Sequence, residues 1–221
     1  GKEVLARYIY KIGIRAGKPF VDINCPAIPA TMFESELFGH EAGAFTGATH
    51  KKIGLMEVAD NGILFLDEIA SMPLDLQAKL LRAIEERSFR RLGGTVLINV
   101  DVQILAASNR NLKEMIANGT FREDLYYRLK VADLDLPPLS ARKQDIPDLV
   151  GHFLRKFTAR SGSQITDVTP RAMQALIDYS WPGNIRELSN VIERAVIFCD
   201  DPTIDLHHLS SDVLNAIDTG A

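Results

Sequence analysis

The feature that most constrains the fold is an apolar segment ending in two acids, Gly62-Ile-Leu-Phe-Leu-Asp67-Glu68. Its apolar residues do not alternate with polar ones, so they predict a strand buried on both faces. Comparable strand patterns lie on either side of it, and stretches with helical spacing separate them. Such alternation predicts an α/β core with a parallel sheet and helices on both faces. The predicted strands are 19–24, 62–67 and 100–107, and the predicted helices are 2–12 and 73–87.

The pattern changes after Leu136-Pro-Pro-Leu139. From there helical spacing dominates and no strand pattern returns, so we expect a small all-helical domain. Thr169-Pro170 begins one of its helices with an N-cap residue and a proline in the first turn. We place the α/β core at 1–139, the helical domain at 140–208 and a frayed tail at 209–221. The predicted helices are 145–160, 170–180 and 184–198.

Composition excludes several classes of protein. A net charge of −4 over 221 residues argues against a domain that mainly grips nucleic acid. No apolar run is long enough to span a membrane, and the sequence begins with no secretory signal. Cys25 and Cys199 have no metal-binding spacing, which fits a reducing cytoplasm. Since the chain opens at Gly1 without a methionine, we expect a fragment of a longer protein.

Two short motifs suggest nucleotide chemistry. Asp67 and Glu68 follow an apolar strand and therefore lie at the carboxyl edge of a sheet, where open α/β folds bind ligands. In a nucleotidase the first acid would hold Mg²⁺ and the second would polarise the attacking water. Gly1-Lys2-Glu3 precedes a helix and matches the end of a phosphate-binding loop. The alternatives are that Asp67 caps a turn and that a helix happens to begin with Gly-Lys.

A third motif, Gly43-Ala-Phe-Thr-Gly-Ala48, presents an aromatic ring and a hydroxyl between glycines. Glycines at both ends suit a loop that reverses direction and moves. The alternative is a surface turn with a half-buried phenylalanine.

Together with its neighbours this string resembles the bacterial enhancer-binding proteins, the NtrC-like AAA+ ATPases that activate sigma-54 RNA polymerase. Matching blocks occur in the same order along nearly the whole chain. The blocks are Asn24-Cys-Pro-Ala27, Glu36-Leu-Phe-Gly-His-Glu-Ala-Gly-Ala-Phe-Thr-Gly-Ala48, the strand that ends in Asp67-Glu68, Gly93-Gly94, Phe121-Arg-Glu-Asp-Leu-Tyr-Tyr-Arg-Leu129, Leu136-Pro-Pro-Leu139 and Trp181-Pro-Gly-Asn-Ile-Arg-Glu-Leu188.

The resemblance implies a partner-binding loop. In that family the loop projects from a ring of subunits and touches sigma-54, so Phe45 and Thr46 would be contact residues. A second loop at Arg91–Thr95 would lie beside it, and Glu57 with Arg91 would help to relay the state of the nucleotide site. The residues assigned to the first loop are Gly43, Ala44, Phe45, Thr46, Gly47 and Ala48.

The resemblance also implies a nucleotide site that takes ATP and Mg²⁺. Asp67 and Glu68 match the Walker B acids, and Asn24 matches the asparagine that holds that glutamate until the nucleotide state changes. Asn109 matches the sensor that meets the γ-phosphate or water. The residues that would bind nucleotide are Gly1, Lys2, Glu3 and Arg186. Only the end of the phosphate-binding loop is present, and the strand before it is missing.

Two further arginines, Arg122 and Arg128, match those supplied to a neighbouring subunit's nucleotide. Without the matched block, surface ion pairs with Glu123 or Asp124 would be the favoured interpretation of these arginines. The implied assembly is a homo-oligomeric ring of six or seven copies acting on sigma-54 RNA polymerase holoenzyme. DNA would be bound only through a domain outside this chain, and no membrane is involved. Trp181 is expected in the core of the helical domain, and His207-His208 as a solvated pair.

Three functions remain open. The first is the ring ATPase that remodels sigma-54 holoenzyme for promoter opening. The second is an inactive, nucleotide-free fragment that only folds or binds sigma-54, suggested by the incomplete phosphate-binding loop. The third is a different AAA+ remodeller, such as a protease-linked unfoldase, which the string at 43–48 disfavours.

Overall fold

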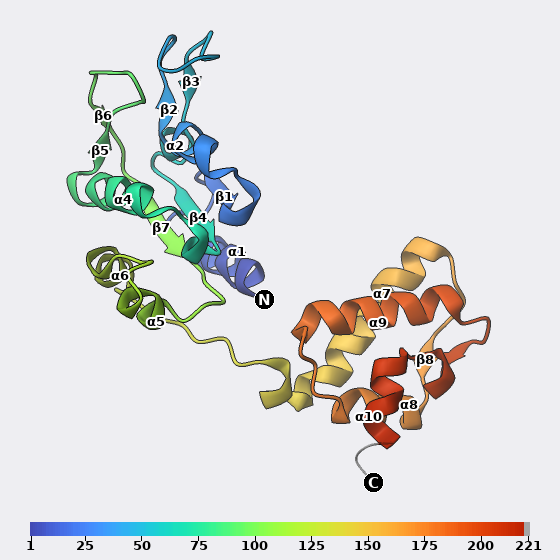
Figure 1. Cartoon of the computed structure of the whole chain (residues 1–221). Helices are drawn as coiled ribbons and strands as arrows, with labels where there is room; N and C mark the ends of the chain where they lie inside the picture. The colour runs from blue at the N-terminus through green and yellow to red at the C-terminus, as the bar shows by residue number, and fades with distance from the viewer. Residues whose placement is uncertain (219–221) are drawn as a thin grey trace. The chain divides into compact units, whose positions relative to one another are not determined.

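A three-stranded parallel sheet forms the centre of the first part of the molecule (Figure 1). The structure is a computed structural model that describes the backbone of residues 1–218 and the side chains of residues 1–215. The chain divides into two compact units between Leu134 and Asp135, five residues before the expected boundary. The elements of the first unit are α1 (Lys2–Ile12), β1 (Phe20–Asn24), α2 (Ala30–Phe38), β2 (Gly39–His40), β3 (Lys52–Ile53), α3 (Leu55–Val58), β4 (Ile63–Asp67), α4 (Leu74–Glu86), β5 (Ser88–Phe89), β6 (Ile98–Asn99), β7 (Gln103–Ala106), α5 (Leu112–Ala117) and α6 (Glu123–Leu129), with 3₁₀ turns at Cys25–Ala27 and Ile69–Ser71.

Strand β4 is the middle of this sheet, with β1 and β7 parallel to it on either side. Its residues Ile63 to Leu66 are at most 3% exposed, which explains why the sequence shows no alternation there. The α/β fold with a parallel sheet is confirmed, and each predicted strand and helix of this unit is present with ends shifted by at most three residues.

The two faces of β4 meet different helices. Leu64 and Leu66 belong to the main core, which α2, α4 and α6 complete. Phe65 points to the opposite face, where its ring lies 6.4 Å from that of Phe20, and Phe20 contacts Tyr10 of α1 at 5.1 Å. Helices therefore cover both faces, as expected.

Two antiparallel hairpins, β2–β3 and β5–β6, extend from one end of this unit (Figure 1). Their bases are joined by backbone hydrogen bonds of 3.0 Å, from Leu92 N–H to Gly39 O and from Glu41 N–H to Leu92 O. Gly39 has a φ of +75°, and a Cβ there would lie 2.4 Å from the carbonyl oxygen of Lys52, so only glycine fits. These two-residue strands are too short to give a sequence pattern.

The second unit packs α7, α8, α9 and α10 around Trp181, which is 1% exposed and donates a 2.7 Å hydrogen bond from its indole N–H to Leu176 O. The helical character and the buried Trp181 are confirmed, with one small addition: a parallel pair of two-residue strands. The elements are α7 (Ile146–Ser161), β8 (Asp167–Val168), α8 (Pro170–Asp178), α9 (Asn184–Phe198), β9 (Thr203–Ile204) and α10 (Ser211–Asp218), with 3₁₀ turns at Leu139–Ala141, Lys143–Asp145 and Leu206–His208.

The expectation of a frayed tail after Ser210 is wrong for 211–218. Those residues form α10, which lies against α8, and Val213 is 1% exposed. The short apolar pattern there was too brief to outweigh the polar residues around it. Residues 219–221 lie outside the described part of the chain. Within residues 1–218 no helix combines the length and apolar character needed to cross a bilayer.

Candidate functional site

The carboxyl edge of the sheet gathers the expected acids. Asn24 ends β1 and Asp67 ends β4, and the two are direct partners in the parallel register. The Oδ1 atom of Asp67 is buried and has no hydrogen-bond partner within the described residues. A buried carboxylate oxygen without a partner is costly, so this atom fits the oxygen donor set that Mg²⁺ prefers.

Glu68 is held from two sides. Its Oε1 accepts a 2.8 Å ion-paired hydrogen bond from Lys2 Nζ, and its Oε2 accepts one of 3.0 Å from the backbone N–H of Asn109. The residue itself has a left-handed backbone with φ of 56°, which costs a non-glycine residue about 1 kcal/mol. The contacts of Glu68 hold it in this conformation. The structure thus brings the start of α1, the end of β4 and the end of β7 together at one carboxylate.

Asn24 takes no part in that arrangement. Among the described residues no hydrogen bond joins its side chain to Glu68, so its proposed hold on the glutamate stays a prediction. Next to it, burial raises the pKa of the Cys25 thiol to about 12, and the nearby Asp67 carboxylate adds to the rise. Cys25 is therefore an unreactive thiol beside the acids.

The remaining candidates of the phosphate-binding loop lie at the start of α1. Gly1 is the N-cap residue, and its carbonyl oxygen accepts the Leu5 N–H at 3.0 Å. Glu3 pairs with Arg7 at 2.9 Å, on the surface of the helix. The side chain of Lys2 reaches Glu68.

The paired arginines occupy different places on α6. Arg122 is its N-cap residue and forms a bidentate ion pair with Asp124, at 3.0 and 2.6 Å. The hydrogen bond between them raises the pKa of Arg122 and lowers that of Asp124. Arg128 is exposed near the other end of α6. Within the described residues neither arginine forms an ion pair with Glu68, and their assignment to a neighbouring subunit stays a prediction. Arg186, in the second unit, is exposed in the first turn of α9.

The loop of Gly43–Ala48 closes on itself and exposes its tip. Gly43 N–H donates to Ala48 O at 2.7 Å, and Ala48 N–H donates to Phe45 O at 3.0 Å. Phe45 is 45% exposed and Thr46 is also exposed, so both side chains are accessible. The second loop lies against the first, because a Cβ on Gly93 would meet the Ala44 Cβ at 2.8 Å. The expectation that the two loops are neighbours is confirmed.

Arg91 ties the bases of both loops to the core. It donates to Glu41 Oε1 at 2.8 Å and to Glu57 at 2.8 and 2.5 Å, with only 8% of its side chain exposed. Burial alone would lower the pKa of Arg91, but the hydrogen bonds to Glu41 and Glu57 carry it above its ordinary value. The expected pair of Glu57 and Arg91 is therefore a triad that includes Glu41.

With this geometry described, comparison with known proteins identifies the family. A sequence profile described as "Sigma-54 interaction domain" matches residues 1–135, and one described as "AAA+ ATPase lid domain" matches residues 140–220. The chain belongs to the sigma-54 interaction domain family. The resemblance found in the sequence is confirmed, and the second unit is the lid of an AAA+ domain.

Curated relatives of this sigma-54 interaction domain are longer regulators. It is 56% identical over 204 residues to the Regulatory protein AtoC of Escherichia coli, which covers 92% of the chain and 44% of that protein. It is 50% identical over 205 residues to the Transcriptional regulatory protein FlbD of Caulobacter vibrioides, covering 93% of the chain and 45% of that protein. The chain spans about half the length of the curated relatives it matches.

Solved structures agree. NtrX from Brucella abortus, crystallised in complex with ADP, matches with a TM-score of 0.89 at 41% identity, over 97% of this chain and 48% of that one. The same protein in complex with ATP matches equally well, over the same shares of the two chains.

The sequence analysis missed His40 and Glu41, although both stand directly before the loop string. A hydrogen bond of 2.7 Å joins His40 Nδ1 to the hydroxyl of Ser35, and the His40 ring lies edge-on to Phe45 with 5.0 Å between centroids. Their place beside a Gly-rich loop was the available signal, but the contacts depend on how the hairpin folds. His40 thus supports the aromatic residue at the loop tip.

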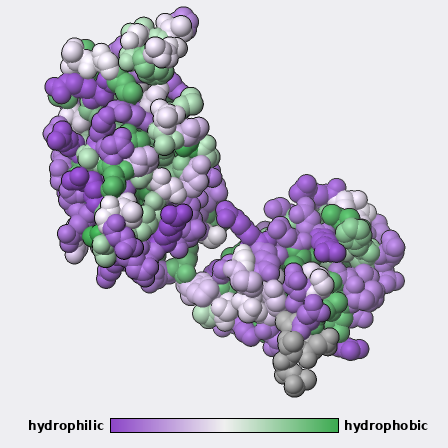
Figure 2. Space-filling view, in the orientation of Figure 1, coloured by the Kyte–Doolittle hydropathy of each residue, from purple (hydrophilic) through white to green (hydrophobic). Residues whose placement is uncertain are grey.

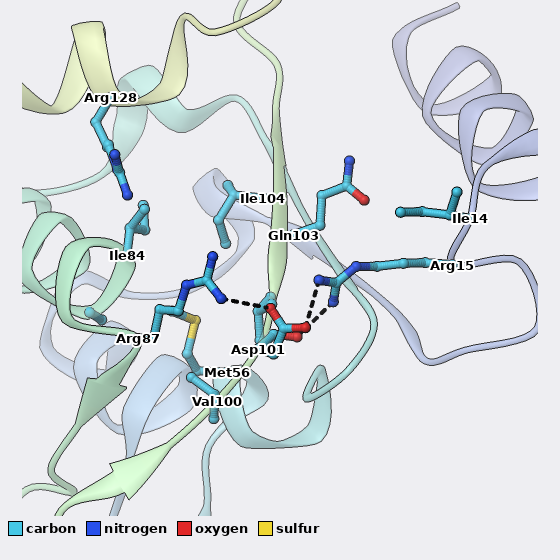
Figure 3. A pocket seen from close by; sticks show the side chains of 12 residues that line it. Ile14, Arg15, Met56, Ile84, Arg87, Val100, Asp101, Gln103, Ile104 and Arg128 are labelled. Carbon is cyan, nitrogen blue, oxygen red and sulfur yellow. Dashed lines mark hydrogen bonds and ion pairs between the residues drawn. The ribbon is translucent and has the colours of Figure 1, made fainter.

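A cavity of about 340 Å³ lies at the amino end of β7, away from the acids (Figure 3). Ion pairs from Asp101 to Arg15, at 2.9 Å, and to Arg87, at 3.9 Å, cross its wall. Arg128 also lines it. Gln103 begins β7 and Ala106, the partner of Leu66, ends it, so the cavity and the acids are separated by roughly 10 Å of strand. The cavity is therefore separate from the nucleotide site.

Proposed function

We propose that this domain hydrolyses ATP in a ring of six or seven copies and uses the energy to remodel sigma-54 RNA polymerase holoenzyme for promoter opening. The observation that carries the proposal is the carboxyl edge of the sheet, where an unpartnered Asp67 oxygen stands beside a Glu68 held by Lys2. Family membership and the ATP and ADP complexes of NtrX support it.

Asp67 would hold Mg²⁺ through its unpartnered oxygen, and the ion would neutralise charge on the phosphates. Glu68 would polarise the attacking water. In this structure Lys2 is ion-paired with the carboxylate of Glu68. Phosphate oxygens would compete for Lys2, and its departure would free Glu68 to act as a base. Asn24 would hold Glu68 until the nucleotide state changes, and the side chain of Asn109 would meet the γ-phosphate or the attacking water.

The two arginines would complete the site of the neighbouring subunit. A guanidinium at the γ-phosphate is worth about 10³–10⁵ in rate in comparable enzymes. Arg122 is available because its partner Asp124 is exposed and such pairs are weak. Arg186 of the lid would sense the phosphates of its own subunit, and Gly1 and Glu3 would complete the phosphate-binding loop.

The loop of Gly43–Ala48 would carry the mechanical output. Phe45 and Thr46 would contact sigma-54, since an exposed aromatic ring and a hydroxyl suit a partner-binding tip. Glu57 and Arg91, with Glu41, would relay the state of the site to both loops. We place the domain in the cytoplasm, where its partner RNA polymerase works, with DNA binding left to another domain.

Replacement of Thr46 by Ala tests the loop assignment. ATP turnover should stay within about twofold, because Thr46 makes no contact with the acids, while formation of open promoter complexes should fall more than tenfold. Thr49→Ala, an exposed threonine just beyond the loop, is the matched control and should change neither quantity. Normal promoter opening by the Thr46→Ala protein would remove the loop from the mechanism.

A further inference from the structure

Gln77 is a buried amide on the apolar face of α4. It is 0% exposed, beside Leu76 and Leu80, which are equally buried. An amide without partners in such a core would cost several kcal/mol, so its partners show what it holds in place.

Within the described residues, the hydrogen bonds of the Gln77 side-chain amide lead to two segments. Gln77 Nε2 donates to the carbonyl oxygens of Met72, at 2.8 Å, and Thr120, at 3.4 Å. Its Oε1 accepts the backbone N–H of Arg122 at 2.8 Å. Met72 lies four residues after Glu68, and Arg122 is the N-cap residue of α6. One side chain therefore joins the segment behind the acids to the start of the arginine helix.

Arg122 combines a fixed backbone with an available side chain. On either side of it, Phe121 and Leu125 are 2% and 0% exposed, and Gln77 fixes its amide. Its guanidinium is 42% exposed and pairs only with Asp124 among the described residues. Movement of the segment that Gln77 holds would therefore carry the Arg122 guanidinium with it.

We propose that Gln77 is a positioning residue for Arg122, fixing the arginine that a subunit lends to its neighbour relative to that subunit's own Asp67–Glu68 segment. The proposal rests on the proposed function, in which Arg122 acts at the adjoining nucleotide. It predicts that loss of Gln77 lowers ATP turnover at the neighbouring site, to which the mutated subunit supplies Arg122. Turnover at the mutated subunit's own site should stay unchanged.

Mixing two inactive variants shows which of the two sites is impaired. Glu68→Gln subunits keep Arg122 but lack a working base, and Arg122→Ala subunits keep a working site. Mixed rings should regain ATP turnover where a working site adjoins an intact arginine. Gln77→Met, of similar length but apolar, is then combined either with Glu68→Gln or with Arg122→Ala in the same subunit.

The expected result is asymmetric. Gln77→Met in the Glu68→Gln lender should reduce the regained turnover about 10- to 100-fold, since small misplacements of a reacting group cost that much. In the Arg122→Ala partner it should change turnover by less than about twofold. Phe33→Leu, a core change on α2 away from these segments, is the matched control and should show no asymmetry. Equal losses in both partners, or none, would overturn the proposal.

Amide hydrogen exchange tests the positioning role of Gln77 independently of the proposed ATPase function. If the two parent variants regain no turnover when mixed, the shared site is wrong, and the positioning claim is decided on the Arg122 backbone amide alone. Gln77→Met should then speed exchange of that amide about tenfold or more, with little change for amides of α2. An unchanged rate at Arg122 would overturn the positioning role as well.

Discussion

The two ends of the first unit satisfy their charged groups in different ways. At the carboxyl edge a buried Asp67 oxygen has no partner within the described residues, and Glu68 pairs with a lysine for which, on the proposed function, phosphates would compete. At the hairpin end, which lies at the top of this unit in Figures 1 and 2, Arg91 pairs with both Glu41 and Glu57.

The difference separates a site whose carboxylate oxygen a cation would complete from a scaffold whose charges are already paired. An unpaired acceptor is a cost that a cation would remove, so the carboxyl edge would gain stability on binding. Within the described residues the Arg91 Nε is also buried without a partner, but both of its terminal nitrogens are paired with carboxylates, and breaking those pairs costs free energy. The proposed chemistry and the proposed mechanical output would thus rest on different physical principles.

The largest expected effect is at the carboxyl edge. Asp67→Asn should reduce ATP turnover about 100-fold or more, because a neutral amide holds Mg²⁺ poorly. The midpoint of thermal unfolding without nucleotide should not fall, since the unpartnered charge is gone. Asp75→Asn, an exposed acid in the first turn of α4, is the control for both quantities. A clear loss of stability in Asp67→Asn would contradict the comparison.

At the hairpin end we expect a substitution to lower the stability of the fold. Arg91→Met should lower the free energy of unfolding of this unit by about 2–4 kcal/mol, because Glu41 and Glu57 then face each other without their shared cation. Denaturant titration measures this. Arg90→Met removes only an exposed arginine bonded to Thr95 O and should cost less than about 0.5 kcal/mol. Equal losses in the two variants would show that the triad is not what stabilises the loops.

A smaller effect concerns the loop tip. His40→Ala removes the ring that Phe45 contacts, so chymotrypsin should cleave after Phe45 roughly 2- to 10-fold faster, as expected for the loss of one aromatic contact. His40→Asn should retain the bond to Ser35 and give an intermediate rate. The matched control is His50→Ala, an exposed histidine just beyond the same loop. Unchanged cleavage in His40→Ala would mean that Phe45 does not depend on this support.

The smallest expected effect is on the pKa of Cys25, which lies beside Asp67 at the carboxyl edge. Because the pKa of Cys25 is raised to about 12 from near 9, the neutral thiol favours the folded state fully below pH 9, and this stability is lost as pH rises toward 12. Asp67→Asn should lower the pKa of Cys25 slightly, since burial is the larger cause. The rate of Cys25 alkylation against pH measures it; a pKa near 9 in the folded protein would contradict the buried placement.

Local pattern predicted the secondary structure but not the pairing of side chains. Strand β4 was recognisable because burial on both faces leaves a continuous apolar run, and Lys2, Asp67 and Glu68 followed from their positions beside predicted elements. The bond from the Asn109 backbone to Glu68, and the buried Gln77, depend on contacts between segments more than forty residues apart. Glu41 was hidden for the same reason: its partner Arg91 is fifty residues away.

The helical unit shows the same limit at its end. The caps at Thr169-Pro170 and the spacing of α9 are local signals, and both helices were predicted. Helix α10 is short and amphipathic, and its stability comes from Val213 entering the core of the lid. Sequence spacing cannot report such a tertiary contact in an eight-residue helix.

The most direct test of the account is ATP turnover per subunit against protein concentration, for this chain extended upstream of Gly1 to a complete phosphate-binding loop. The account predicts turnover that rises steeply with concentration and falls about 10³-fold or more in Arg122→Ala, as for a site shared between subunits. Turnover that is independent of concentration, or absent at every concentration, would contradict the shared site and favour a module that only binds.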